Sequence, residues 1–432
     1  MERPVKPTEK NNKGELTESE FAAAIRMLGG RAFIVGGYVR DFWRGASPHD
    51  RDYVLTGVTE ADFCQKFPTA KKVGRSFPVY LLTIDGQACE VAFGRRERKA
   101  GSGYTGFQVD FSATVTIEED LSRRDTTINA MAMELPAKNL LDPYGGREDI
   151  KRGLIRAVSE RFKEDPVRAL RAARQATEFS YTIEANTIKL MAECREELKK
   201  EPTERIFHEM ERALAAERPS LFFRYLQKAN LLADNFPEIA ALRGKTQPAA
   251  FHPEGDAFEH TMLLLDKVAA QTTRPIARFA ALCHDLGKGT TPEEMLPHHY
   301  GHEVRGADVL QSWNSRMTLP HRWLKAAVFV SQSHMKAPRL KKPGKIRDLL
   351  LAVKTSFLTF AEYNAIILAD SGALPWYLAC HAECLSAIES VNGRQAPPNV
   401  RGAAIGEWLR KEQIRRLVAV ASSAREQGNL SE

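Results

Sequence analysis

The stretch FIVGGYVRDFWRGASPHDRDYVLTG (33–57) restricts the fold of this chain more than any other. An apolar strand ends at Gly36 and Gly37, the segment YVRDFWRG reads as a helix, and a second strand follows. Paired glycines at such a junction let the backbone approach a phosphate while N–H groups of the helix point at it. This order predicts a domain of mixed α and β structure with a phosphate-binding turn after its first strand.

Two carboxylates stand on the second of these strands. Asp50 and Asp52 are separated by one residue, so the strand period puts both on one face and Arg51 on the other. Unpaired carboxylates on one face repel each other in a plain core, but they suit a hard divalent cation such as Mg²⁺. One or two such ions, bridging triphosphate oxygens and an attacking hydroxyl, give in-line nucleotidyl transfer. We predict that Asp50 and Asp52 are catalytic metal ligands; a solvated strand end is the alternative.

A third carboxylate lies further along the chain. Glu90, in ACEVAFGRRERK, follows the apolar run VYLLTI after one short turn. A neighbouring strand there would bring Glu90 to the same metals. Pairing with Arg95 or Arg96 is an equal alternative, so the catalytic role of Glu90 stays open.

Arginines follow the carboxylates in LSRRDTTINAMAME (121–134). Arg123, Arg124 and Asp125 stand directly before residues of core character. Basic side chains at the mouth of a metal–carboxylate site suit a triphosphate. A surface arginine pair is the alternative.

The segment EDPVRALRAARQ (164–175) predicts a helix with Pro166 in its first turn. Arg168, Arg171 and Arg174 share one face of this helix at a spacing of three residues. A triphosphate and base pocket needs such a stripe, although a solvated helix face also accounts for it.

Asp165 and Arg168 together could select a base without a template. Cytosine and adenine both present an amine donor beside a ring-nitrogen acceptor, which a carboxylate and a guanidinium match. Guanine and uracil present a carbonyl and an N–H there, and would leave buried groups unpaired. The pair therefore predicts a preference for C and A.

These segments, in this order and spacing, resemble the motifs of the class II tRNA nucleotidyltransferase and bacterial poly(A) polymerase superfamily over about residues 31–425. His49 departs from the pattern, because Lys or Ile is commoner there, and the first 30 residues have no counterpart. RRERKAGSGYTGF (95–107) is similar to the loop with which family members change from CTP to ATP. The other matching segments are GGYVRDFWRG…DRD, RRDTTINAMA, DPYGGREDI (142–150), EDPVRALRAAR and RIFHEMERAL (205–214).

The resemblance implies an α+β chain, with a nucleotidyltransferase-fold head built on a mixed sheet and all-helical neck, body and HD domains behind it. It implies that Asp50 and Asp52 hold Mg²⁺ and that Asp165 and Arg168 read the base. The residues implied to bind the rest of the nucleotide are Gly37, Arg40, Arg124, Arg171 and Arg174.

Histidines and aspartates recur between residues 258 and 370, with an adjacent His–Asp pair in ALCHDLGKG. Imidazole and carboxylate suit first-row divalent metals, and two ions can orient a water against a phosphate ester. The pattern resembles the HD phosphohydrolase superfamily. Behind such a head, it implies 2′,3′-cyclic phosphodiesterase, 2′-nucleotidase and phosphatase activity with Ni²⁺ or another divalent metal. The predicted site residues are His260, His284, Asp285, His302, His334 and Asp370, while His298 and His299 stay unassigned.

Five regions follow from this pattern. Short β-rich runs (32–35, 53–56, 79–84 and 89–93) alternate with turns and helices, and amphipathic helical runs come after them. The stretch RGKTQPAAFHPEGD (243–256) reads as a linker. The predicted regions are an N-terminal extension (1–30) that contains a helix from Glu18 to Met27, the head (31–156), a nucleotide-selecting and RNA-binding neck and body (157–250), the HD domain (251–375) and a helical tail (376–432).

Composition adds little to these motifs. The net charge of +7 is compatible with a polyanionic partner but does not demand one. No apolar run reaches the ~18 residues of a membrane span, and the polar N-terminus has no signal segment, so we expect a cytoplasmic protein. The six scattered cysteines read as reduced thiols. The cluster Cys380, His381 and Cys384 is more simply a coincidence of helical spacing than a zinc site.

The leading hypothesis is stepwise addition of C, C and A to the tRNA 3′ end from CTP and ATP, with release of pyrophosphate. The alternatives are a poly(A) polymerase, an A-only or CC-only enzyme, and a catalytically dead tRNA-binding adaptor. The HD residues argue against the polymerase, and the intact Asp50 and Asp52 argue against the adaptor. A homodimer is left open.

Overall fold

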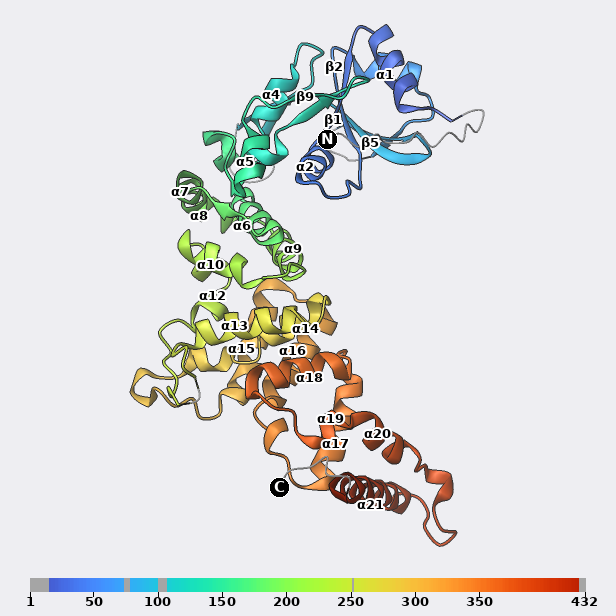
Figure 1. Ribbon diagram of the computed structural model, residues 1–432, viewed down its shortest axis with the longest axis vertical. Coiled ribbons are helices and arrows are strands. Elements are labelled where there is room, and N and C mark those ends of the chain that lie inside the picture. The colour runs from blue at the N-terminus through green and yellow to red at the C-terminus, as the bar shows by residue number, and fades with distance from the viewer. Residues whose placement is uncertain (1–14, 74–77, 100–106, 251, 427–432) are drawn as a thin grey trace. The chain divides into compact units, whose positions relative to one another are not determined.

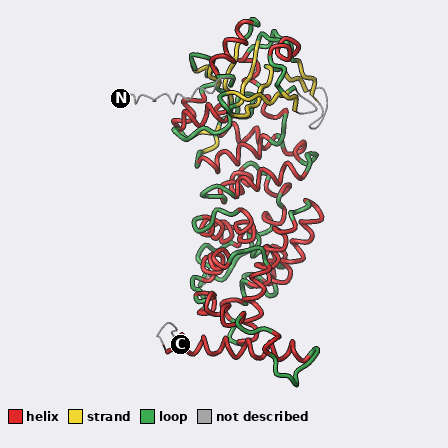
Figure 2. Tube along the Cα trace, turned by 90° about the vertical axis from the view of Figure 1, so that its right-hand side faces the viewer, coloured by secondary structure: helices red, strands yellow, loops and turns green. Residues whose placement is uncertain are grey.

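The computed structural model describes residues 15–73, 78–99, 107–250 and 252–426. They form two compact units, of which the first runs to residue 172 and includes 181–201, and the second contains 173–180 and the chain from 202 onward. Figure 1 labels the elements. In Figure 2 the strands belong to the first unit, and helices build the second. The predicted α+β class is confirmed.

A seven-stranded mixed sheet is the centre of the first unit, with strand order β3-β4-β5-β2-β1-β8-β9. All neighbours in it are antiparallel except β2 and β5, which run parallel. The strands are β1 (Arg31–Val35), β2 (Asp52–Thr56), β3 (Lys71–Val73), β4 (Val79–Ile84), β5 (Gln87–Phe93), β8 (Ala132–Glu134) and β9 (Asn139–Leu141), with the separate pairs β6 (Arg96–Lys99) with β7 (Phe107–Asp110) and β10 (Leu154–Ile155) with β11 (Thr182–Ile183).

Helices of the first unit pack on this sheet through apolar side chains. Phe33 and Val35 of β1 and Val54 of β2 form a buried cluster with Ile117 and Leu121 of α4. Burial of such side chains stabilises the fold by about 1.5–3 kcal/mol each. The helices are α1 (Glu18–Met27), α2 (Gly37–Arg44), α3 (Glu60–Lys66), α4 (Ile117–Ser122), α5 (Gly146–Arg152), the start of α6 (Arg168–Phe179), α7 (Ala185–Glu193) and α8 (Arg195–Leu198).

Helix α1 is built into the sheet unit. Thr17 and Glu20 form a capping box at its start, which satisfies free N–H groups of the first turn. Phe21 and Ile25 are fully buried, and the Phe21 ring meets the edge of Tyr53 at 5.3 Å between centroids. The described part of the expected N-terminal extension therefore packs on the head.

The second unit surrounds an aromatic core. Phe236 and Phe279 contact Trp313, with ring centroids 6.2 and 5.5 Å apart, and Phe279 also contacts Trp323 at 5.2 Å. Its helices are α9 (Thr203–Leu214), α10 (Ser220–Lys228), α11 (Leu232–Asn235), α12 (Pro237–Ala240), α13 (Ala257–Ala269), α14 (Pro275–Leu282), α15 (His302–Met317), α16 (His321–Ser333), α17 (Pro343–Thr355), α18 (Phe360–Ser371), α19 (Trp376–Ala379), α20 (His381–Glu389) and α21 (Ala404–Glu426).

Candidate active sites

The register of the sheet brings the predicted head carboxylates to the glycine turn. Asp52 opens β2 and lies opposite Val35, the residue that precedes Gly36 and Gly37. On its other side Asp52 lies beside Glu90 of the parallel strand β5. Asp50 precedes the strand instead of lying in it, because β2 starts at Asp52. The carboxylates of two strands and the glycine turn therefore lie side by side on the central strands of the sheet.

Electrostatics indicates that these carboxylates lie close together. Burial raises the pKa of Asp52 to about 6, the charges of Glu90 and Asp50 act in the same direction, and Arg124 opposes them. Arg51 points elsewhere and pairs with Asp85 at 2.8 Å. A divalent cation would balance this concentration of negative charge, and the neighbouring guanidinium would suit a triphosphate.

Gly37, Arg40 and Arg124 gather around the same turn. Gly36 has φ 69°, a conformation that favours glycine, and a Cβ there would lie 3.3 Å from Arg124 Nη1. A Cβ on Gly37 would lie 3.5 Å from Arg40 Nη2. Arg40 donates to Asn129 Oδ1 at 2.8 Å. Two guanidinium groups thus lie beside the backbone N–H groups that open α2.

Asp125 holds Arg171 against the head. The carboxylate is 6% exposed and accepts from Arg171 Nε at 2.8 Å and from Asn129 Nδ2 at 3.0 Å. Although burial opposes ionisation, Arg171 and these hydrogen bonds keep the pKa of Asp125 well below its usual value. Arg171 is fixed in this way while 42% of its side chain stays exposed.

The other residues of the predicted arginine helix have different surroundings. Asp165 accepts from the Val167 N–H at 3.2 Å, and the buried Arg168 donates to the carbonyl of Arg161 at 2.8 Å. Arg174 is buried in the second unit between Glu178 and Glu209, each at 2.5 Å. The expected stripe is thus divided, and its nucleotide-binding role stays a prediction.

The predicted HD residues converge on Asp285 in the second unit. Asp285 Oδ1 lies 3.1 Å from His302 Nε2 and 3.4 Å from His334 Nε2. The Oδ2 atom lies 3.0 Å from His284 Nε2 and 2.5 Å from Lys288 Nζ. Burial opposes ionisation here, but the interactions of Asp285 with His284 and Lys288 hold its pKa well below the usual value.

His260 and Asp370 complete this cluster. His260 Nε2 lies 3.2 Å from Asp370 Oδ1, and His284 Nε2 lies 3.8 Å from the same oxygen. These contacts join α13, α18 and the turn after α14. All six residues predicted from the sequence are therefore neighbours in the structure.

The imidazoles are oriented for a metal. The Nδ1 atoms of His284, His302 and His334 lie 2.7–2.9 Å from backbone carbonyls, so each Nδ1 carries the proton and each Nε2 lone pair faces the cluster. His260 Nδ1 lies 2.6 Å from Glu254 Oε1, which has the same effect. Outer partners of this kind fix the tautomer of a ligand histidine.

The donor set fits divalent metal ions. Two groups of ligand atoms each lie within 4.8 Å of one another, namely His260, His284 and Asp370, and Asp285, His302 and His334. His284 Nε2 and both oxygens of Asp285 are buried, and their close contacts with one another and with Lys288 lack hydrogen-bond geometry. A bound cation would stabilise such an arrangement. Among the described residues the head carboxylates do not form such a group.

The stretch 243–256 is not a linker, so that interpretation is wrong. Its described residues supply Glu254 to His260 and Gln247 to Lys288, and His252 forms a further possible ligand group with Glu254 and His260. Asp256 caps α13. The signal was present as a histidine two residues before a glutamate in HPEGD, but the proline and glycine suggested a flexible connection.

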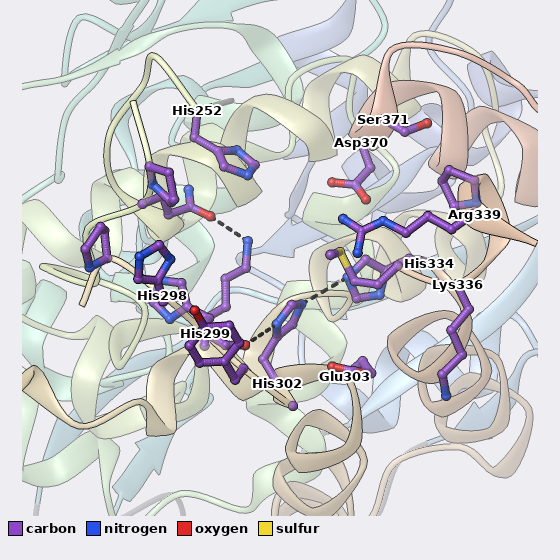
Figure 3. A pocket seen from close by; sticks show the side chains of 18 of the residues that line it. His252, His298, His299, His302, Glu303, His334, Lys336, Arg339, Asp370 and Ser371 are labelled. Atoms are coloured by element: carbon purple, nitrogen blue, oxygen red, sulfur yellow. Dashed lines mark hydrogen bonds between the residues drawn. The ribbon is translucent and has the colours of Figure 1, made fainter. Parts of the chain in front are cut away.

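A cavity of about 820 Å³ opens onto the HD cluster. Figure 3 shows His302 and His334 in its middle, His298 and His299 on one side, and Arg339 and Lys336 on the other. Pockets for small ligands usually have volumes of about 300–1,000 Å³. The HD cluster is therefore accessible to a molecule the size of a nucleotide.

Two further predictions lie elsewhere. Cys380 and Cys384 have sulfur atoms 3.9 Å apart, and burial raises the pKa of both thiols. With His381 they are not among the possible metal groups of the described residues. The proposed CTP-to-ATP loop (95–107) falls largely outside the described residues, which include its flanks in β6 and β7.

The fold and the two sites define the class of the protein: a nucleotidyltransferase head followed by an HD-type metal-binding domain. Three family models match the chain, described as the poly A polymerase head domain (32–156), a probable RNA and SrmB-binding site of polymerase A (180–242) and the HD domain (257–354).

Relatives give the particular family. The multifunctional CCA protein of Nitrosococcus oceani is 39% identical over 89% of this chain and 97% of its own length. That of Pasteurella multocida is 45% identical over 67% of this chain and 70% of its own length. The chain belongs to the multifunctional CCA protein family.

Solved structures share the fold. The Bacillus stearothermophilus CCA-adding enzyme in complex with CTP has a TM-score of 0.61 at 23% identity, covering 94% of this chain and 97% of that one. The Thermotoga maritima CCA-adding enzyme complexed with tRNA has a TM-score of 0.59 at 21% identity, covering 92% and 89%. Within the described residues, no helix has the length and apolar character that crossing a membrane requires.

Proposed function

We propose that the head adds C, C and A to the 3′ end of tRNA, using CTP and ATP and releasing pyrophosphate. The observation that carries this proposal is the register of the strands around β2. It sets Asp52 beside Glu90 of β5 and opposite Val35 of β1, which precedes the glycine turn. The names of the relatives, and the CTP, ATP and tRNA complexes of CCA-adding enzymes with this fold, support the choice of substrates.

The reaction joins the terminal hydroxyl of the RNA to the α-phosphorus of the triphosphate and breaks the bond to pyrophosphate. Asp50, Asp52 and Glu90 would hold Mg²⁺, which neutralises the triphosphate and favours ionisation of the attacking hydroxyl. Arg40 and Arg124 lie beside the glycine turn and are placed to bind the triphosphate with the N–H groups of α2.

Selection of C and A falls to Asp165 and Arg168 in this proposal, with Arg171 binding the nucleotide. The buried guanidinium of Arg168 and the fixed position of Arg171 support these roles. Arg174 could bind the nucleotide only if its ion pairs with Glu178 and Glu209 broke. Among the proposed nucleotide-binding arginines it therefore has the least structural support.

The second activity that we propose is metal-dependent hydrolysis of phosphate esters at the HD cluster, with 2′,3′-cyclic phosphates and 2′-phosphates as substrates. A water oxygen would attack phosphorus, the ester P–O bond would break, and the leaving oxygen would take up a proton. The ions would orient and acidify the water. Ni²⁺ or a similar first-row ion suits the imidazole-rich donor set.

We further propose that both reactions take place in the cytoplasm, and that the head, the neck and body, the HD domain and the tail meet near residues 156, 250 and 375. The limits of the matched family models support the boundary near 156 and the one near 250, which falls between the models that end at 242 and begin at 257.

One experiment tests the head activity directly. The protein is incubated with Mg²⁺ and tRNA lacking CCA, with each single nucleoside triphosphate and with CTP plus ATP, and the products are sized. Extension by three nucleotides only with CTP plus ATP is the expected result. A long ladder from ATP alone on generic RNA would establish a poly(A) polymerase instead.

A further inference from the structure

The wall of the HD cavity contains basic and aromatic residues that are not metal ligands. Arg339 and Lys336 are the basic ones, and His298 and Tyr300 are the aromatic ones. Neither basic residue forms an ion pair with a residue that the structure describes. Lys288, by contrast, is bound between Asp285 and Gln247.

Arg339 is placed to bind an anion next to the metal-ligand cluster. In Figure 3 its side chain extends from the wall toward the region between Asp370 and His334. The residue lies at the end of the short turn that follows His334, and the hydroxyl of Tyr377 donates to the carbonyl of Ala337 in that turn. An arginine fork held by such a turn suits the paired oxygens of a phosphate ester.

Tyr300 offers a flat apolar surface at the same cavity. Its ring is stacked on His298 with centroids 5.6 Å apart and 22° between the planes, yet 70% of the residue is exposed. The backbone around it is fixed, because Arg305 donates to the Tyr300 carbonyl and His299 bonds to Thr291 and to the carbonyl of Thr246. An exposed ring on a fixed loop is a stacking surface for a nucleobase.

We propose that the HD cavity recognises a nucleotide as a whole, with Arg339 binding the phosphate and the Tyr300–His298 stack binding the base. This inference rests on the proposed hydrolytic function and adds its specificity. The cavity of about 820 Å³ has room for a base, a ribose and a phosphate. The ligand is either a free mononucleotide or the terminal nucleotide of an RNA, which share this chemistry.

Binding measurements separate the two contacts. Full-length protein is loaded with Ni²⁺ and titrated with AMP and with ribose 5-phosphate, which lacks the base, in a calorimeter. We expect AMP to bind about tenfold more tightly. Tyr300→Ala removes this difference and leaves ribose 5-phosphate binding unchanged, whereas Tyr300→Phe keeps the ring and the difference. Arg339→Ala weakens both ligands by about ten- to a hundredfold.

Matched controls exclude general damage. Lys341→Ala removes a nearby exposed positive charge, and Val304→Ala removes a nearby exposed apolar side chain, but neither residue lines the cavity. Both controls should bind the two ligands as the unaltered protein does. The nickel content of every variant should stay the same, since none of these residues belongs to the ligand groups.

Equal binding of AMP and ribose 5-phosphate, or normal binding by Arg339→Ala, would overturn the inference. Its failure is distinct from failure of the hydrolytic function, which is measured on adenosine 2′,3′-cyclic phosphate with the unaltered protein. Kinetics then identifies the source of the nucleotide. If Tyr300→Ala raises KM for the cyclic mononucleotide, free nucleotides use the stack; if it does so only for a short RNA ending in a cyclic phosphate, the terminal nucleotide does.

Discussion

The head and the HD domain both present acidic side chains to divalent metals, but they do so in different ways. The head places its carboxylates on and before central strands of the sheet, where Asp50 and Glu90 are exposed. The HD cluster buries His284 and Asp285 almost completely and fixes the imidazoles from behind. Under the proposed function, this difference predicts that the head binds its divalent metal together with a triphosphate, whereas the HD domain keeps a resident metal.

The most severe test of this comparison is Asp52→Ala. We expect nucleotide addition to fall by at least about a thousandfold, because the substitution would remove a proposed metal ligand of the head. Metal-dependent hydrolysis by the HD domain should be unchanged. The two activities are measured on the same preparation with tRNA lacking CCA and with adenosine 2′,3′-cyclic phosphate. Loss of both would show that the sites are not independent.

Asp285→Asn is the reciprocal change. We expect hydrolysis to fall by about a thousandfold while nucleotide addition is retained, since Asp285 contacts all four histidines of the cluster and bears the charge that a metal would balance. Metal analysis after gel filtration should find bound metal in the unaltered protein and little in the variant. Equal metal content in both would argue against a resident ion bound by Asp285.

Asp125→Asn tests the stability of the head. We expect a loss of about 2–3 kcal/mol at neutral pH, because Arg171 and Asn129 lose an ionised partner. The pKa of Asp125 is lower in the folded than in the unfolded protein. The carboxylate therefore contributes stability above the unfolded value of about 4, and this contribution is lost as the pH falls below it.

Denaturant unfolding at several pH values measures this effect. The difference between the unaltered protein and Asp125→Asn should be constant near neutral pH and should shrink below about pH 4. A difference that grows on acidification would contradict the assigned direction of the pKa.

The smallest expected effect is that of Glu254→Gln. Glu254 orients His260 from outside the cluster, so we expect metal affinity to fall by about tenfold while the fold is kept. The measurement is a competition of the purified protein with a metal-binding dye. Glu259→Gln is a suitable control, because Glu259 is on the same helix as His260 but pairs with Arg224. An unchanged affinity for Glu254→Gln would mean that His260 needs no outer partner.

Several features were predictable because they depend on neighbouring residues. The strand, glycine pair and helix at 33–44 appear where expected, as β1 and α2. The helix from Glu18 to Met27 has the predicted bounds because its capping residues are adjacent to it. The six HD residues were predicted from the adjacent His–Asp pair after an apolar run, with a histidine upstream and an aspartate downstream, a combination that suits a divalent metal.

Other features depended on contacts between distant segments. The register of β2 with β5 places Glu90 beside Asp52, and no local pattern specifies that register. The spacing of Arg168 and Arg174 predicts that they share one helix face. Arg174 instead forms a buried ion pair with Glu209, which is 35 residues further along the chain. The proline- and glycine-containing stretch 243–256 looked like a linker because turns and ordered loops have the same composition.

The sequence by itself thus determined which chemistries this protein carries: carboxylates after a glycine turn, and a histidine–aspartate set. Only the tertiary structure decided how each is used. It brought Glu90 to Asp52, Glu254 to His260 and Arg339 to the HD cavity. The physical reason is that residue type sets what a side chain can bind, whereas burial and the approach of distant segments set its charge, its orientation and its partners.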